Sequence, residues 1–264
     1  MNKKPDKSEV TSLDKAIQIL QYLTQLDKDI SLKDLSAGVN MPKATLIRLL
    51  TTMKRHGLIQ QDVATKNYRL GWALIYMGTA ASRLFDLPKI IHPYLERLSR
   101  ESGESASLVQ FQRDSAVYVD QVSCTNLIRS GLGVGAQLQI HLSAAGKILI
   151  SDMPDEAIRK FIKRNPLIKR TEKTITSEEA FLREIHSVRE NGYALDDEEG
   201  EIGGRCIAAP IRDWNDNILA SISITGPSSR VHKETMPRLI ELVCEVASMA
   251  SDELKCGSRQ NTTN

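Results

Sequence analysis

The chain has 264 residues, of which 41% are hydrophobic and 26% charged, and this length fits one large or two medium-sized globular domains. It contains no run of 18 apolar residues and no apolar segment near its start, so we expect neither a membrane span nor a signal peptide. Residues 1–72 hold 12 Lys and Arg against 7 Asp and Glu, whereas the remainder holds 23 against 26, a weak asymmetry that suits a polyanion-binding part joined to a part that binds no polyanion.

Three helices are predicted before residue 56. Apolar residues at helical spacing mark the first helix at residues 13–26. Ser31 and Asp34 have the spacing of a capping box for a second short helix, which Gly38 is expected to end by adopting a positive φ. Pro42 suits the first turn of the third helix.

The third helix has one apolar and one polar face. Its apolar stripe consists of Leu46, Leu49, Leu50 and Met53. The opposite face has small, hydroxyl and basic side chains, which let a helix approach DNA closely and bond phosphates or a guanine edge. We interpret residues 32–51 as a helix-turn-helix whose second helix enters the major groove. The candidate DNA contacts on it are Lys43, Ala44, Thr45, Arg48 and Thr52. An ordinary helical hairpin with a solvated basic face is the alternative.

A short β-hairpin is predicted after the third helix. Residues 58–59 and 68–70 have strand character and are separated by a polar segment. This hairpin is typical of a winged helix-turn-helix, and Lys66 and Arg69 on the wing are candidates for phosphate contacts. Residues 10–72 are therefore predicted to form the DNA-binding domain, followed by a helical linker at 73–88 that would transmit orientation between domains.

The remaining chain mixes strands and helices, which predicts an α+β effector domain at residues 89–256 and a disordered tail at 257–264. Strands are expected at residues 106–112, 116–122, 193–195, 206–211 and 218–224. Helices are expected at residues 89–101, from residue 143 to 150, and at 177–191 and 234–254. Residues 127–140 are rich in glycine and are expected to be irregular.

A candidate effector site comes from three segments of this domain. The backbone N–H groups at the start of the helix after Ser143 can hold a carboxylate, and Ala144, Ala145 and Gly146 leave room for it. The second segment is residues 196–206, with Asp196 and the Cys206 thiol. The third is a row of hydroxyls on one strand, formed by Ser221, Ser223 and Thr225, although Ser221 is expected to point away from the pocket.

Read from end to end, the chain resembles the IclR family of transcriptional regulators. The blocks that carry the resemblance are SLDKA at 12–16, PKATLIRLL at 42–50, YRLG at 68–71, HLSAAGK at 141–147, NGYA at 191–194, DDEE at 196–199, GGRCIAAP at 203–210 and SISITGP at 221–227. The resemblance implies a winged helix, a helical linker and a GAF-like α/β effector-binding domain. It also implies a dimer or tetramer on a palindromic operator.

The resemblance also bears on the ligand. Family members often bind organic or sugar acids, and Ala145, Asp196, Cys206, Ser223 and Thr225 match the ligand-contacting positions of the family. Many relatives have two basic residues and a proline before the Leu-His pair, whereas this chain has none of them between Gly133 and His141. Because that loop borders the pocket in the family, the identity of the ligand is open.

The sequence therefore predicts a cytoplasmic, ligand-responsive transcriptional repressor of a catabolic operon. We expect double-stranded DNA, a small carboxylate effector and further copies of the chain as its partners, with no cofactor and no metal. Four scattered cysteines without a CxxC pair favour a reduced compartment and no zinc finger.

Three other interpretations remain open from the residues alone. His141, Cys206 and the acidic cluster at 196–199 include the residue types of a cysteine hydrolase or of a metal site, but no local motif frames them. The chain could also be a metabolite- or redox-sensing module whose basic head binds RNA or protein.

Overall fold

The computed structural model describes residues 11–26, 28–82, 86–128 and 131–256. The chain forms two compact units, Met1–Asp86 and Leu87–Asn264. The tail expected at residues 257–264, and residues 83–85 of the expected linker, lie outside the described residues.

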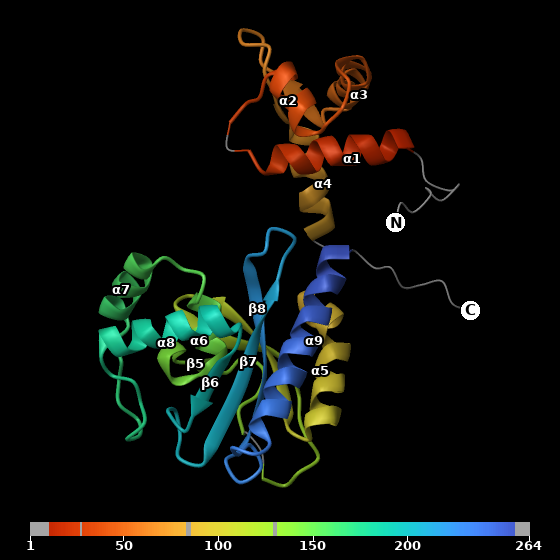
Figure 1. The fold of residues 1–264 in the computed structure, drawn as a ribbon. Helices are drawn as coiled ribbons and strands as arrows, with labels where there is room; N and C mark the ends of the chain where they lie inside the picture. Colours follow the sequence, from red (N-terminus) through yellow and green to blue (C-terminus); the bar gives the residue numbers. More distant parts are fainter. Residues whose placement is uncertain (1–10, 27, 83–85, 129–130, 257–264) are drawn as a thin grey trace, which may run out of the picture. The chain divides into compact units, whose positions relative to one another are not determined.

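The first unit has the winged helix-turn-helix fold that the sequence predicts. It contains the helices α1 (Thr11–Thr24), α2 (Leu32–Gly38), α3 (Lys43–Arg55) and α4 (Trp72–Ser82) and the strands β1 (Ile59–Gln61) and β2 (Tyr68–Leu70). The two strands pair as an antiparallel hairpin with Ile59 opposite Leu70 (Figure 1). Ile19, Leu35 and Leu46 are fully buried and join the three helices into one core.

The helix ends in this unit agree with the sequence only in part. Ser31 caps α2 as predicted, because its hydroxyl accepts a hydrogen bond from the Asp34 N–H at 3.2 Å. The predicted positive φ of Gly38 is wrong, since the left-handed residue is Asn40, with φ 47°. Gly38 is the last residue of the helix, where a β-carbon would collide with the ring and hydroxyl of Tyr22. Pro42 precedes the first turn of α3 as its N-cap residue rather than lying in it.

The second unit is built on one antiparallel sheet with the strand order β5-β4-β3-β8-β7-β6. Its strands are β3 (Ser105–Gln112), β4 (Ser115–Val122), β5 (Gln137–Leu138), β6 (Ala194–Asp197), β7 (Gly204–Arg212) and β8 (Ile218–Pro227). Its helices are α5 (Leu87–Ser102), the 3-10 helix η1 (Ile140–Leu142), α6 (Ala144–Ile150), α7 (Asp155–Arg164), α8 (Glu178–Asn191) and α9 (Met236–Cys256). No described helix is long and apolar enough to cross a bilayer.

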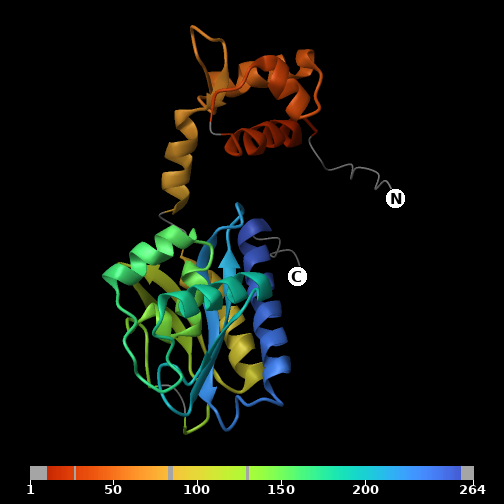
Figure 2. The ribbon, with the colours of Figure 1, turned by 60° about the vertical axis from the view of Figure 1, so that its left-hand side comes forward.

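Helices cover both faces of this sheet (Figures 1 and 2). The long helices α5 and α9 lie side by side on one face and pack on Leu108, Ile207 and Ile222. On the other face, α6, α7 and α8 pack on Val109 and Ala208. Because neighbouring side chains on a strand point to opposite faces, the sheet has two separate apolar cores.

This alternation corrects one expectation about β8. Ser221, Ser223 and Thr225 are two residues apart without an intervening bulge, so all three side chains lie on the α6 face of the sheet. The sequence predicts that Ser221 points the other way, whereas in the structure its side chain lies on the same face as those of Ser223 and Thr225. Its hydroxyl is fully buried and donates a hydrogen bond to the backbone oxygen of Ala209 at 3.4 Å.

Candidate functional site

The helix α3 presents a polar surface on the side opposite its core. Leu46, Leu50 and Met53 are buried. On the outer face Lys43, Ala44, Arg48 and Thr52 are exposed, and Thr45 is half-buried. The Thr52 hydroxyl donates to the backbone oxygen of Arg48 at 3.2 Å, which leaves its lone pairs facing outward as acceptors. The five candidate DNA contacts on this helix thus share one accessible face.

The wing places the other two candidates differently from each other. Asp62 fixes the turn, because one of its carboxylate oxygens accepts bonds from the Ala64 and Thr65 N–H groups at 3.0 and 2.7 Å. Lys66 follows in the left-handed region with an exposed side chain. Arg69 is turned back toward its own unit, since its Nη1 lies 3.5 Å from an Asp29 carboxylate oxygen. Lys66 is therefore more available than Arg69 for a phosphate.

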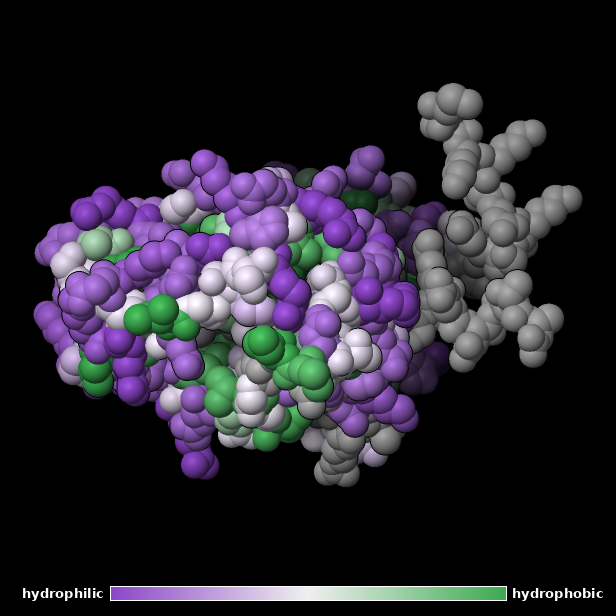
Figure 3. All heavy atoms as spheres, turned by 90° about the horizontal axis from the view of Figure 1, so that it is seen from below, coloured by the Kyte–Doolittle hydropathy of each residue, from purple (hydrophilic) through white to green (hydrophobic). Residues whose placement is uncertain are grey.

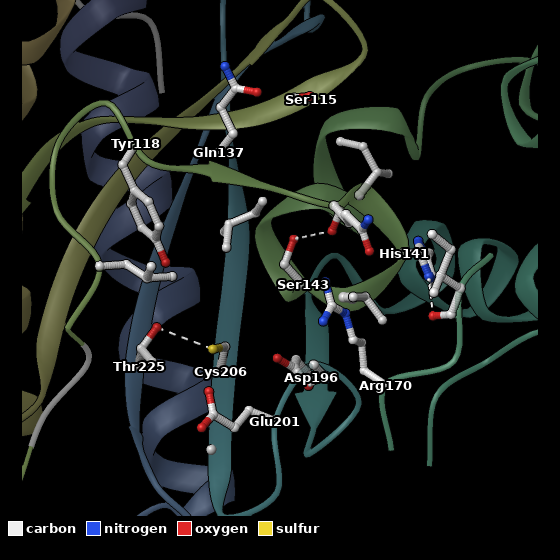
Figure 4. A pocket seen from close by; sticks show the side chains of 18 of the residues that line it. Ser115, Tyr118, Gln137, His141, Ser143, Arg170, Asp196, Glu201, Cys206 and Thr225 are labelled. Atoms are coloured by element: carbon white, nitrogen blue, oxygen red, sulfur yellow. Dashed lines mark hydrogen bonds between the residues drawn. The ribbon is translucent and has the colours of Figure 1, made fainter. Parts of the chain in front are cut away.

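The second unit holds a cavity of about 1160 Å³ at one end of its sheet. Its wall is formed by the last residues of β6 and β8, the first residues of β7, the η1–α6 turn and residues 164–170. Figure 4 shows Tyr118, Ser143, Asp196, Cys206 and Thr225 with their side chains around this space. Polar groups converge here beside apolar side chains such as Ile140 and Phe161, which is typical of a small-molecule site.

Three of the seven predicted effector residues line the cavity, namely Asp196, Cys206 and Thr225. They meet because β6 pairs with β7 and β7 with β8, so that Cys206 is opposite both Asp196 and Thr225. The Cys206 Sγ lies 3.2 Å from the Thr225 Oγ1. Ala144, Ala145, Gly146 and Ser223 are buried and do not line the cavity.

Gly146 shows why the expected carboxylate site at the start of α6 does not form as predicted. A β-carbon at this residue would lie 2.6 Å from the Ile140 Cα, so the glycine serves the packing of η1 against α6 rather than access of a ligand. Its N–H already donates to the Ser143 hydroxyl at 3.1 Å. Ser143 itself lines the cavity and is the part of this turn that a ligand can contact.

Burial keeps Asp196, Cys206 and Tyr118 protonated to higher pH than usual. Desolvation raises the pKa of Asp196, although the N–H groups of Glu199 and Gly200 donate to its carboxylate. Desolvation and the nearby Asp196 charge raise the pKa of Cys206 to about 12. Burial likewise raises the pKa of Tyr118. At neutral pH these thiol and phenol groups are therefore neutral hydrogen-bonding groups.

The same chemistry argues against a cysteine nucleophile. A thiol with such a raised pKa has almost no thiolate at neutral pH. The His141 ring donates through Nε2 to the backbone oxygen of Ile168 at 3.1 Å, and burial lowers the pKa of this histidine. Within the described part of the chain, no group of three or more His, Cys, Asp and Glu side chains is arranged to hold a metal ion.

Sequence reasoning missed two features of the site. Lys147 is fully buried beneath it, and its Nζ donates to Glu199 at 2.6 Å, to Glu184 at 2.9 Å and to the backbone oxygen of Leu195 at 2.8 Å. Arg170 lines the cavity from a segment without regular structure. A lysine in a helix and an arginine in a loop usually face solvent, so neither position carries a signal in one sequence.

Both units match models of known families. The IclR helix-turn-helix domain matches residues 12–63, and the C-terminal domain of the bacterial transcriptional regulator IclR matches residues 79–252. The chain belongs to the IclR family. Among its relatives, the transcriptional repressor IclR of Escherichia coli (strain K12) is 31% identical over 245 residues, which are 92% of this chain and 89% of the relative.

Other members of the IclR family agree. The acetate operon repressor of Salmonella typhimurium is 30% identical to this chain, and the match covers 92% of this chain and 89% of the relative. The repressor AllR of Escherichia coli (strain K12) is also 30% identical, over 92% of this chain and 90% of its own. The crystal structure of Thermotoga maritima IclR covers 94% of this chain and 100% of its own, with 27% identity and a TM-score of 0.62. An IclR-family chain of this kind is a DNA-binding transcriptional regulator with an effector domain.

Proposed function

We propose that this chain is a cytoplasmic repressor that releases a catabolic operon when a small organic acid binds its second unit. The observation that carries the proposal is the cavity, where Asp196, Cys206, Thr225 and Ser143 converge in a chain that also exposes the face of α3. The names of its relatives as repressors, one of them of an acetate operon, support the direction of control.

The DNA contacts that we propose lie on α3 and the wing. Arg48 and Thr52 read base edges, while Lys43, Ala44 and Thr45 bring the start of α3 close to the backbone. Lys66, and Arg69 once it leaves Asp29, bind phosphates. The effector contacts are Asp196, Cys206, Thr225 and the Ser143 hydroxyl; Ala144, Ala145, Gly146 and Ser223 act through packing behind that wall.

We further propose that the regulator is a homodimer or a pair of dimers on a palindromic operator. The exposed surface of α4 supports self-association, because Trp72, Ile75, Tyr76 and Met77 are large apolar side chains that all lie open to solvent. Two recognition helices related by a two-fold axis then read two half-sites about one helical turn, or a multiple of it, apart.

Selection of bound duplexes from a random DNA pool tests the proposal. The expected product is a two-fold symmetric sequence whose affinity for the protein, measured by fluorescence anisotropy, falls when a carboxylic acid is added. A coupling free energy of about 1–3 kcal/mol between the two sites would be ordinary, which corresponds to a loss of about 5- to 150-fold in affinity. Enrichment without symmetry would contradict the dimer, and affinity that no acid changes would contradict the regulation.

A further inference from the structure

The charges around the cavity single out Arg170. Of the lining residues that the structure describes, Arg164 and Arg170 carry a permanent positive charge. Arg164 lies 3.8 Å from the carboxylate of Asp114, whereas no carboxylate of the described residues is within ion-pair distance of Arg170. Figure 4 shows the Arg170 side chain extending into the cavity toward Ser143 and Asp196.

The segment that carries Arg170 is held in place. The Thr171 hydroxyl donates to the backbone oxygen of Glu198 at 2.7 Å, and the Thr174 hydroxyl donates to that of Glu199 at 2.7 Å. These bonds tie the segment to the turn after β6, whose residues 200–204 form the neighbouring part of the wall. The guanidinium is therefore presented to the cavity from a fixed backbone.

The other charged groups direct an anion to this guanidinium. Glu201 also lines the cavity, and its negative charge disfavours an anion beside it, as does Asp196 above its raised pKa. His141 adds no positive charge at neutral pH, because burial lowers its pKa. Residues 131–142 contain no Lys or Arg. Among the lining residues that the structure describes, Arg170 is therefore the one next to which a carboxylate gains most.

Apolar side chains form part of the exposed rim of the cavity, beside the polar and charged Gln137, Gln139, Arg164, Arg170 and Glu201. Ile128, Leu132, Ile168 and Ile202 line the cavity and are nevertheless exposed, with 72% of Ile128 and 79% of Ile202 open to solvent. In Figure 3, which views the molecule from the end where the sheet's loops lie, apolar patches interrupt the polar surface. Exposed apolar area gains free energy when another apolar body covers it, at about 25 cal/mol per Å².

From these observations we infer the class of the effector: a monocarboxylic acid with an aromatic or extended aliphatic body. Its carboxylate pairs with Arg170, and its apolar body covers Ile128, Leu132, Ile168 and Ile202. A two-carbon acid has no apolar body to cover these side chains, and a sugar acid would set its hydroxyls against them. The inference rests on the proposed function of the cavity as an effector site.

Isothermal titration calorimetry on the full chain tests this class with four probes, 4-phenylbutyrate, its neutral amide, acetate and gluconate. We expect 4-phenylbutyrate to bind about tenfold or more tightly than each of the other three. Arg170→Gln should lower its affinity to that of the amide, since the charge-assisted bond is lost. Arg183→Gln on α8, an exposed arginine that does not line the cavity, is the matched control and should leave all four affinities unchanged.

Three results would overturn the assignment: tighter binding of acetate or gluconate than of 4-phenylbutyrate, a preference for acid over amide that survives Arg170→Gln, or no binding of any acid. The same probes added to the protein–DNA complex separate this inference from the proposed function. If acetate or gluconate alone releases DNA, the ligand class fails and the regulation stands. If 4-phenylbutyrate binds through Arg170 without changing DNA affinity, the ligand class stands and the regulation fails.

Discussion

The Nζ of Lys147 donates a 2.6 Å hydrogen bond to a carboxylate oxygen of Glu199, and no part of the lysine side chain reaches solvent. This bond joins α6 to the turn that follows β6, and the backbone of that turn forms part of the cavity wall. The second carboxylate oxygen of Glu199 is buried without a hydrogen-bond partner among the described residues. The ion pair therefore positions the wall, and little else compensates the buried charge of Glu199.

Lys147→Met is expected to destabilise the chain by about 3–5 kcal/mol, because it leaves buried carboxylates without their cation. Urea unfolding measures the loss. Lys169→Met is the matched control: its partner Glu172 is 93% exposed and Lys169 itself 53%, so this surface pair contributes at most about 1 kcal/mol. Equal losses in the two variants would show that the buried pair does not hold the wall.

Gly71, which follows β2, and Gly78, which lies inside α4, distinguish close packing from helix propensity. A β-carbon at Gly71 would lie 2.8 Å from the Gly57 carbonyl carbon and 2.9 Å from the Ile59 nitrogen, whereas at Gly78 it would meet nothing within 4 Å. Gly71→Ala should destabilise the first unit by about 1–3 kcal/mol, as is typical of overpacking, and so lower its thermal midpoint. Gly78→Ala should raise it, since alanine favours a helix by about 1 kcal/mol. A Gly71→Ala variant as stable as the wild type would contradict the packing of this turn.

The sequence was sufficient for the first unit because its signals are local. The stripe of α3, the Ser31 cap and the polar turn of the wing each depend on residues within a few positions of one another. The helix α7 has such signals as well, because acidic residues lie in its first turn and basic residues in its last. Nevertheless, no helix is predicted there from the sequence. The prediction of a positive φ at Gly38 is wrong because the feature that requires a glycine there is a close contact with Tyr22, which lies on another helix.

Only those residues of the effector site that strand pairing brings together could be predicted from the sequence. Asp196, Cys206 and Thr225 meet through strand register, and the family resemblance implies that they are ligand-contacting positions. The roles of Gly146, Lys147 and Arg170 depend on how η1, α6 and the segment before α8 fold onto that sheet. No spacing in the sequence indicates those contacts. From the sequence alone, Gly146 is interpreted as part of a helix start, Lys147 as a surface charge and Arg170 as a loop residue.

Arg48 on α3 is expected to determine specificity. Arg48→Ala should weaken binding to the selected duplex by about 1–3 kcal/mol while leaving effector affinity unchanged, since it removes a two-bond contact with a guanine. Arg48→Lys keeps the charge but not the planar fork, so it should retain binding to random DNA and lose preference for the selected site. Anisotropy titrations on both duplexes measure this. Unchanged affinity in Arg48→Ala would show that α3 does not read the bases.

The raised pKa of Asp196 gives stability a predictable pH dependence. Between pH 3.8 and the raised value, the folded carboxyl holds a proton that the unfolded chain has released, so its contribution to stability falls as pH rises. Asp196→Asn removes this fall, and the variant should gain stability relative to the wild type on going from about pH 4 to 7. Asp155→Asn should show the opposite sign, because Arg189 and His186 lower the pKa of Asp155. Denaturant unfolding from about pH 2 to 7 measures both, because the stability linked to the lowered pKa of Asp155 is lost only below about pH 3.8, and the same sign in both variants would contradict the burial of Asp196.

Cys206 and Ser223 are expected to respond differently to truncation, although both are strand residues on one face of the sheet. Cys206 lines the cavity as a neutral thiol beside the Thr225 hydroxyl, whereas Ser223 is buried behind it. Cys206→Ala should weaken effector binding by about 0.5–1.5 kcal/mol through loss of a hydrogen-bonding group, and Ser223→Ala should leave it unchanged. Calorimetry with the acid that binds the wild type most tightly measures both, with DNA affinity as the check that each variant is folded. If Ser223→Ala lost as much affinity as Cys206→Ala, the ligand would lie deeper against β8 than the cavity wall allows.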